Sequence, residues 1–287
     1  MDSLNFWVIQ TFNGVSYGAL LFLLGAGLSL IFGVMRIVNL AHGSYFLLGG
    51  YVALTVIWTT GSWALALPMA ALAIAVVGLL MERIFLRPLG FDPLRQVLLT
   101  VGFAFLFQQA ALDLWTGNNF DINPPDALTD SVEMAGLFLP LYRVFMITTA
   151  LAIGIVLWLA MEKTRLGAQV RATVDDAQMA RGVGIDTSRI SMMIFSLGAF
   201  LAGLGGVIGG AFLGVYPGLD FEILPLAFAV VIIGGMGSLG GAAIGALIVG
   251  LADNFGKALF PEISYFTLYA PMALILAVKP TGLFGRE

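Results

Sequence analysis

The chain has 287 residues, of which 60% are hydrophobic and only 10% are charged. Because soluble globular domains carry charge at about a quarter of their positions, this composition excludes such a domain and predicts an integral membrane protein. The sequence has no cysteine and a single histidine, His42. Disulfides, thiolate metal sites and a histidine-rich metal site within one chain are therefore excluded. The formal net charge of −4 says little, because the two signs are segregated along the chain.

Apolar runs of bilayer-crossing length follow one another along the chain. We expect membrane segments at about residues 12–32, 46–60, 62–80, 97–115, 141–161, 190–213 and 265–278. A further apolar run, residues 224–252, contains five glycines among residues 234–241, where a continuous helix is disfavoured. The predicted fold is all-α, with one transmembrane domain over residues 1–287. It is a polytopic helical bundle with eight or nine membrane segments, at least one of them broken by glycines.

The loops between these runs alternate in charge. Nine Lys and Arg residues fall in three alternate loops, residues 33–45, 82–96 and 162–189, whereas residues 117–140 are acidic and contain neither Lys nor Arg. Short loops rich in Lys and Arg face the cytoplasm. We therefore place the three basic loops inside, and the N-terminus and residues 117–140 outside. Residues 214–222 are interpreted as a short outer turn.

The glycines of residues 234–241 bear on where the tail lies. If residues 224–252 cross once, Lys279 and Arg286 end outside, against the charge rule; a turn at the glycines returns the tail to the inside, and we favour the turn. A G-x-G-x-x-G string is present, but no strand precedes it and both flanks are apolar, so it does not indicate nucleotide binding. We assign the following residues to a helix break or close packing: Gly234, Gly235, Gly237, Gly240 and Gly241.

Residues 162–190 are the one long charged passage and are predicted to lie in the cytoplasm. Thr173 and Asp176 stand in a capping-box relation, and Arg181 followed by Gly182 forms a favourable helix end. These signals predict a helix of about two turns, residues 173–181. Val170, Val174 and Ala177 are expected to rest on the membrane body, leaving Asp175, Gln178 and Arg181 facing outward. We interpret the passage as a docking element.

Polar residues within the apolar runs are few. Asn39 and His42 are candidates for the transport pathway or for a structural role. Every Asp and Glu except Asp113 is expected at or outside a segment boundary, so the chain lacks an evident site for ion coupling. Energy is therefore expected from outside the chain, through residues 162–190. A self-sufficient channel or secondary carrier, and a membrane-embedded enzyme, are the alternatives; neither has the residues that it needs.

Four stretches resemble a known family: GLSLIFGVMRIVNLAHGSYFLLGGY (27–51), ERIFLRPL (82–89), TRLGAQVRATVDDAQMARGVGIDTSRI (164–190) and VVIIGGMGSLGGAAIGALIVGLADN (230–254). Together they are similar to the smaller of the two related permease subunits of bacterial branched-chain amino-acid ABC importers. Permeases for urea and short-chain amides have the same form, so the substrate stays open between them. In such permeases the third stretch holds a coupling helix, in which Asp175, Ala180, Gly184 and Ile185 match recurrent positions.

The resemblance implies a non-catalytic translocation subunit that crosses the bacterial inner (cytoplasmic) membrane many times. Its implied partners are a homologous second permease subunit, two ATP-binding subunits, a periplasmic substrate-binding protein and the lipid bilayer, with no nucleic acid. It implies no cofactor in this chain, because ATP and magnesium bind the partner ATPase. The residues that we assign to ATPase coupling are Arg171, Thr173, Asp175, Asp176, Gln178, Ala180, Arg181, Gly184 and Ile185.

Overall fold

The computed structural model describes residues 3–90, 92–134 and 136–285, which are mostly helical. The α-helices are α1 (Ser3–Met35), α2 (His42–Thr60), α3 (Trp63–Met81), α4 (Pro93–Trp115), α5 (Leu141–Lys163), α6 (Arg165–Asp175), α7 (Ala177–Gly182), α8 (Thr187–Leu213), α9 (Leu219–Gly234), α10 (Leu239–Leu259) and α11 (Ser264–Val278). A π-helical turn, η1 (Glu82–Leu86), continues α3, and short 3-10 turns are η2 (Arg87–Leu89), η3 (Asp126–Leu128) and η4 (Pro261–Ile263).

The predicted all-helical, multi-span architecture is confirmed. Within the described part of the chain, 6 helices are long and apolar enough to cross a membrane: Leu4–Met35, Trp63–Leu89, Pro93–Trp115, Leu141–Lys163, Thr187–Leu213 and Leu239–Leu259. One feature differs from an all-α chain. The acidic loop contains a small antiparallel hairpin, β1 (Ser131–Met134) and β2 (Leu137–Pro140), in which Ser131 pairs with Pro140.

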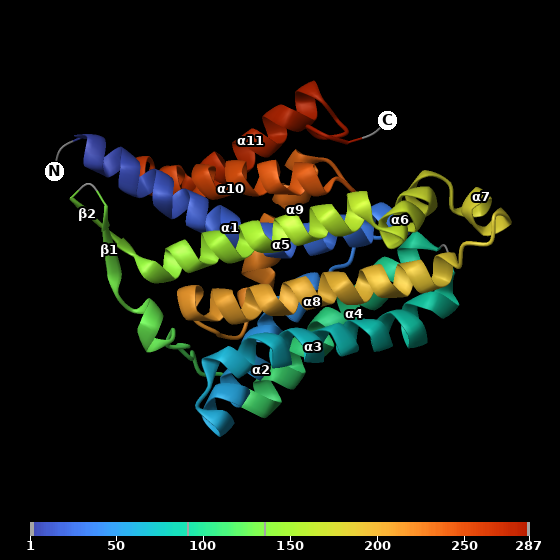
Figure 1. Ribbon diagram of the computed structural model, residues 1–287, viewed down its shortest axis with the longest axis horizontal. Coiled ribbons are helices and arrows are strands. Elements are labelled where there is room, and N and C mark those ends of the chain that lie inside the picture. The colour runs from blue at the N-terminus through green and yellow to red at the C-terminus, as the bar shows by residue number, and fades with distance from the viewer. Residues whose placement is uncertain (1–2, 91, 135, 286–287) are drawn as a thin grey trace.

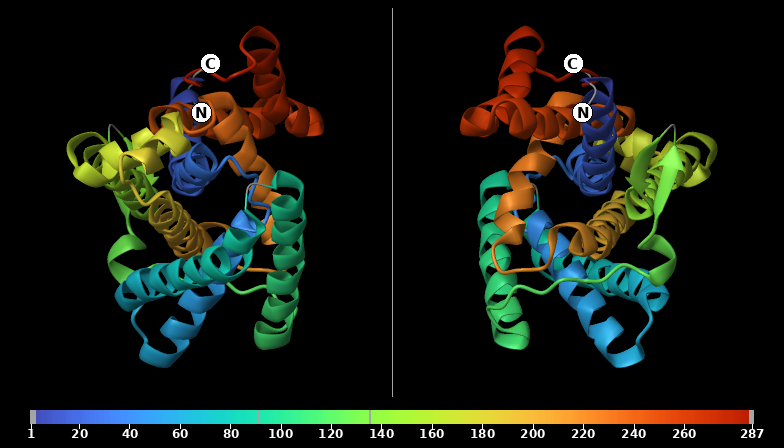
Figure 2. Two further views of the ribbon diagram at one scale, coloured as in Figure 1. Left: turned by 90° about the vertical axis from the view of Figure 1, so that its right-hand side faces the viewer. Right: turned by 90° about the vertical axis from the view of Figure 1, so that its left-hand side faces the viewer.

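The long helices lie roughly side by side, so the molecule has two distinct ends (Figure 1). One end holds α6, α7 and the C-terminus, and we call it the charged end. The opposite end holds the N-terminus with β1 and β2, and we call it the hairpin end. Viewed along the helices, α1 lies between α5, α8 and α10, whereas α11 stands at the edge of the bundle (Figure 2).

Glycine allows the central helices to approach one another closely. A Cβ built on Gly27 of α1 would lie 2.7 Å from the carbonyl oxygen of Gly198 on α8. On the other side of α1, a Cβ on Gly18 would lie 2.8 Å from the carbonyl oxygen of Ala246 on α10. Small residues at helix crossings bring backbones together in lipid, where packing rather than the hydrophobic effect drives association. The core is therefore centred on α1 and α8.

Helix α2 does not begin at the charged end, although α1 ends there. His42, its first residue, has its Nε2 atom 3.0 Å from the carbonyl oxygen of Leu24. Because a helix rises about 1.5 Å per residue, Leu24 lies about 16 Å from the Met35 end of α1. Residues 36–41 therefore return into the bundle without helical structure. Such backbone persists at membrane depth only where protein buries it.

Residues 33–45, predicted as a basic loop, are therefore a loop only over residues 36–41, which return into the bundle, and α2 begins at His42. Asn39 and His42 are buried. The Leu40 N–H donates to Thr100 Oγ1 of α4 (3.2 Å), and the Asn39 Oδ1 atom accepts from the Ala41 N–H (3.2 Å). These hydrogen bonds supply the partners that a strand or helix would otherwise provide.

The prediction of a turn over residues 214–222 was right for its first part and wrong for residues 219–222. The turn covers residues 214–218, and Val215 forms an antiparallel bridge with Phe120. Helix α9 starts at Leu219, so Asp220 lies inside a helix and is 2% exposed. The expectation that acidic residues other than Asp113 stay at or beyond segment ends fails for this residue. Pattern alone missed it because the turn is shorter than the polar composition suggested.

Helices α1–α2–α3 and α8–α9–α10 form two trios of opposite direction. In each trio a long helix crosses the bundle, the chain returns without helical structure, and a shorter helix starts inside. The packing matches: α1 contacts α8 and α10, α8 contacts α1 and α3, and α2 contacts α9. Inverted trios with interrupted helices are a recurrent architecture of transporters, in which the substrate binds near the membrane midplane.

Candidate functional site

The charged passage folds as two helices rather than one. The capping box predicted at Thr173 is wrong, because Thr173 lies within α6, where its hydroxyl donates to the Gln169 carbonyl oxygen (2.8 Å). The backbone breaks at Asp176, which is extended, and its Oδ1 atom accepts from the N–H groups of Gln178 (2.8 Å) and Met179 (2.9 Å). Asp176 is thus the N-cap of α7.

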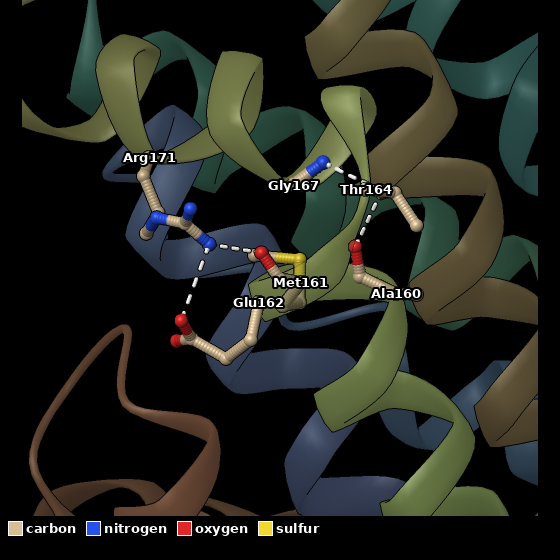
Figure 3. A network of polar contacts seen from close by, with 6 residues as sticks. All are labelled: Ala160, Met161, Glu162, Thr164, Gly167 and Arg171. Carbon is tan, nitrogen blue, oxygen red and sulfur yellow. Dashed lines mark hydrogen bonds and ion pairs between the residues drawn. The ribbon is translucent and has the colours of Figure 1, made fainter.

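Helix α6 is fastened to the end of α5 (Figure 3). The Thr164 hydroxyl caps α6 by accepting from the Gly167 N–H (3.1 Å) and donates to the Ala160 carbonyl oxygen (2.5 Å). The Arg171 guanidinium donates to the carbonyl oxygen of Met161 and lies 3.8 Å from the Glu162 carboxylate. The ion pair is partly exposed and contributes about 0–1 kcal/mol. The backbone bonds therefore hold α6, and α7 projects beyond it.

Helix α7 has one buried and one exposed face. Ala180 is buried, and the Ile185 N–H donates to its carbonyl oxygen (3.0 Å) across Gly184, whose φ is 89°. Met179 and Val183 are 65% and 70% exposed. Asp175 and Gln178 are exposed as predicted, while the exposed Arg181 donates from Nε to Thr187 Oγ1 (2.7 Å).

Met179 and Val183 were not among the predicted coupling residues. The signal that could have found them is their spacing of four, which places them on one side of a helix that cannot bury both sides against the bundle. Val170, expected on the membrane body, is buried there, and Val174 packs against the core. Exposed apolar side chains among polar neighbours mark surfaces that contact a partner.

A small cleft of about 120 Å³, lined by both polar and apolar side chains, lies beneath α7. It is lined by α6 and α7, by the start of α8, and by the ends of α1, α3 and α4; the polar side chains include Glu82, Gln96, Thr173, Arg181 and Thr187. The Oε2 atom of buried Glu82 has no hydrogen-bond partner among the described residues. The cleft lies between α7 and the charged ends of four bundle helices, and α7 itself packs on α6 and on the start of α8. A displacement of α7 would therefore reach each of them.

Helices α9 and α10 are separated by a tight turn at the charged end. Gly235 and Gly237 have φ of 99° and 80°, which an L side chain rarely adopts. Gly234 and Gly241 face each other's backbones, and Gly237 faces the backbone of Gly33. Of the five assigned glycines, Gly240 alone has open space where a Cβ would lie.

The C-terminal segment packs onto this turn. The Leu283 N–H donates to the Ile233 carbonyl oxygen (2.9 Å), and the Phe284 N–H donates to the Gly234 carbonyl oxygen (3.0 Å). The tail through residue 285 therefore lies at the same end of the bundle as α6 and α7.

Comparison with known proteins identifies the family. Residues 10–276 match the model of the branched-chain amino acid transport system permease component. The chain is 31% identical to the high-affinity branched-chain amino acid transport system permease protein LivH of Salmonella typhimurium, over 98% of this chain and 96% of that protein. Identity is 30% with LivH of Escherichia coli over the same shares, and 28% with BraD of Pseudomonas aeruginosa, over 100% of this chain and 98% of BraD.

No solved structure matches the chain. The family match covers most of the chain and includes all of the helices that could span a membrane except the first turns of α1. Family members are transport subunits, and the apolar helices agree with a multi-pass protein of the inner membrane. The chain belongs to the branched-chain amino acid transport system permease family.

Proposed function

We propose that this chain is the membrane-spanning subunit of an ATP-driven importer of branched-chain amino acids. Near-complete coverage of the LivH and BraD relatives, which are named for that transport, supports the substrate class. The role is translocation, and hydrolysis of ATP belongs to partner subunits. The complex would contain a homologous second permease subunit, two ATP-binding subunits and a periplasmic substrate-binding protein.

The observation that carries the coupling role is the form of α7. It is a short helix that follows α6 and packs on the start of α8, with Met179 and Val183 outward and a small cleft beneath it. An ATP-binding subunit that docks on Met179 and Val183 could push α7 against the cleft. Because the cleft touches the ends of four bundle helices, that push would move the bundle at the charged end. This end is the cytoplasmic one in our proposal.

The count of membrane segments belongs to the same proposal. Six helices cross by length and composition, and α2 and α9 are partial segments that begin inside the bundle, which makes eight. Helix α11, with 15 residues, is about 22 Å long, short of the about 30 Å hydrocarbon core. We assign the break between α9 and α10 to the positive φ of Gly235 and Gly237.

Reconstitution tests the proposal. The chain and its partner subunits are placed together in liposomes. These liposomes should take up radiolabelled leucine only when ATP is supplied on the side that carries the ATP-binding subunits and the binding protein is supplied on the opposite side. The chain without its partners should take up none. Uptake by the chain alone would identify a channel or carrier instead, and uptake of urea in place of leucine would identify the amide-type permease.

A further inference from the structure

The starts of α2 and α9 meet in the interior of the bundle. Ser44, the third residue of α2, donates from Oγ to the Oδ2 atom of Asp220, the second residue of α9 (3.0 Å). The neighbouring Gly43 lies against the backbone of Asp220 so closely that a Cβ there would collide with the Asp220 carbonyl oxygen. The two inverted trios are therefore joined at this pair.

This pair lies deep within the bundle. His42, which begins α2, is level with Leu24, about 16 Å from the charged end of α1 by helix rise. The hydrocarbon core of a bilayer is about 30 Å thick, so Ser44 and Asp220 lie near its middle. A carboxylate at such depth costs about 2.5–3.5 kcal/mol on insertion scales and is retained where it serves transport.

The carboxylate of Asp220 is only partly satisfied. Its Oδ1 atom has no hydrogen-bond partner in the described part of the chain, and none of the ion pairs found there includes Asp220. Asp220 is the second residue of α9, so its carboxylate belongs to the first turn of that helix. A helix N-terminus favours negative charge. The site is thus acidic and buried, and no Lys or Arg of the described residues pairs with it.

An aromatic wall packs near the connection that leads into α9, where Phe120 bridges to Val215. Tyr51 is fully buried, and its hydroxyl also lacks a partner among the described residues. Its ring stacks on Trp115 (centroids 5.0 Å apart, planes at 23°) and meets the edge of Phe120 (6.4 Å). One polar corner beside an apolar wall is the arrangement of a small-molecule site.

We propose that Asp220 and Ser44 form a binding site for a primary ammonium group, and that this group is the α-ammonium of the amino acid in passage. The proposal rests on the proposed function and specifies its substrate contact. Asp220 Oδ1 accepts from the ammonium, Tyr51 Oη accepts a second bond, and the aromatic wall contacts the branched aliphatic side chain. Urea and short-chain amides lack a cation, so this site favours amino acids over them.

The test uses the complete transporter in liposomes with its partner subunits. Asp220→Asn keeps the shape and removes the charge. Because a hydrogen bond to a charged group contributes about 1.5–3 kcal/mol, the KM for leucine should rise about tenfold or more. Ser44→Ala removes the hydrogen bond that positions the Asp220 carboxylate but leaves its charge, so KM should rise less, about threefold. Asp113→Asn, on an exposed acid of α4 that bonds only Gln109 among the described residues, is the matched control and should leave KM unchanged.

A second measurement separates ammonium recognition from a structural role. The leucine analogue 2-hydroxy-4-methylpentanoate has a hydroxyl in place of the ammonium. It should not compete with radiolabelled leucine for uptake by the wild-type transporter. In the Asp220→Asn transporter the difference in apparent affinity between leucine and this analogue should become smaller. Its ATPase activity in the absence of substrate should be retained.

Two results would overturn the site. One is an assembled Asp220→Asn transporter with wild-type KM and discrimination. The other, decisive if that variant does not assemble, is Ser44→Ala with unchanged KM and discrimination. A wild type that moves urea and not leucine would instead overturn the proposed function.

Discussion

The two inverted trios share a fold and differ in chemistry. Each has a glycine with positive φ followed by a serine N-cap at the turn to its third helix: Gly61 and Ser62 before α3, Gly237 and Ser238 before α10. At the start of the short helix, however, α2 contributes the Ser44 hydroxyl and α9 contributes the Asp220 carboxylate. The repeated parts are those that backbone geometry requires. The parts that differ face the shared interior, where our proposal places the ammonium group of the substrate.

The surroundings of the two turns also differ. Gly61 has open space where a Cβ would lie, whereas Gly237 faces the backbone of Gly33, and the tail packs on the neighbouring Gly234. The two turns therefore have the same backbone conformation but different packing around it.

The largest expected effect comes from replacing the positive-φ glycine at each of the two turns. Gly237→Leu should abolish most recovery of folded protein, because it adds strain at positive φ and drives a side chain into Gly33. Gly61→Leu should cost about 1–2 kcal/mol from the left-handed conformation alone. Size-exclusion chromatography in detergent measures both. Equal recovery of the two variants would contradict the difference in packing.

The second effect concerns α7, a helix that belongs to neither trio. Changing Met179 and Val183 together to Asp should reduce ATP-driven uptake about tenfold or more, because each buried apolar side chain contributes about 1.5–3 kcal/mol to docking. Folding should be unaffected, since both side chains are exposed. Ala177→Pro is the control, because proline is tolerated at the first position of a helix. Full uptake by the double variant, with normal binding of the ATPase, would exclude docking on this face.

The smallest effect compares the two returning connections. Residues 36–41 depend on the side chain of Thr100, whereas residues 214–218 are held by backbone bonds between Phe120 and Val215 (2.9 and 2.8 Å). Thr100→Val should lower stability by about 1–3 kcal/mol, because it leaves the Leu40 N–H without its partner. Thr148→Val on α5, whose hydroxyl bonds only its own helix among the described residues, should change little. Thermal unfolding in detergent compares the two, and equal melting temperatures would contradict the role of Thr100.

Apolar composition by itself determined the fold class and the long membrane helices. A run of about 20 apolar residues must satisfy its backbone within the segment, and in lipid a helix does so. The sequence also placed the exposed charged passage correctly between α5 and α8, because charged side chains in such density require water. The four motif stretches, which are spread from residue 27 to residue 254, pointed to the permease class that the comparisons show.

Tertiary structure alone decided where the short polar segments lie. Arg36, Asn39 and Asp220 are polar and resemble loop residues. The depth of their segments depends on Thr100, Ser44 and Phe120, which are distant in sequence. The same holds for the helix start in the charged passage. Thr173 and Asp176 are both acceptable caps, and burial of Val170 and Thr173 against the bundle extends α6 past the first, so that the break comes at the second. The local sequence thus allows a helix to start at either residue, and packing against the bundle selects Asp176.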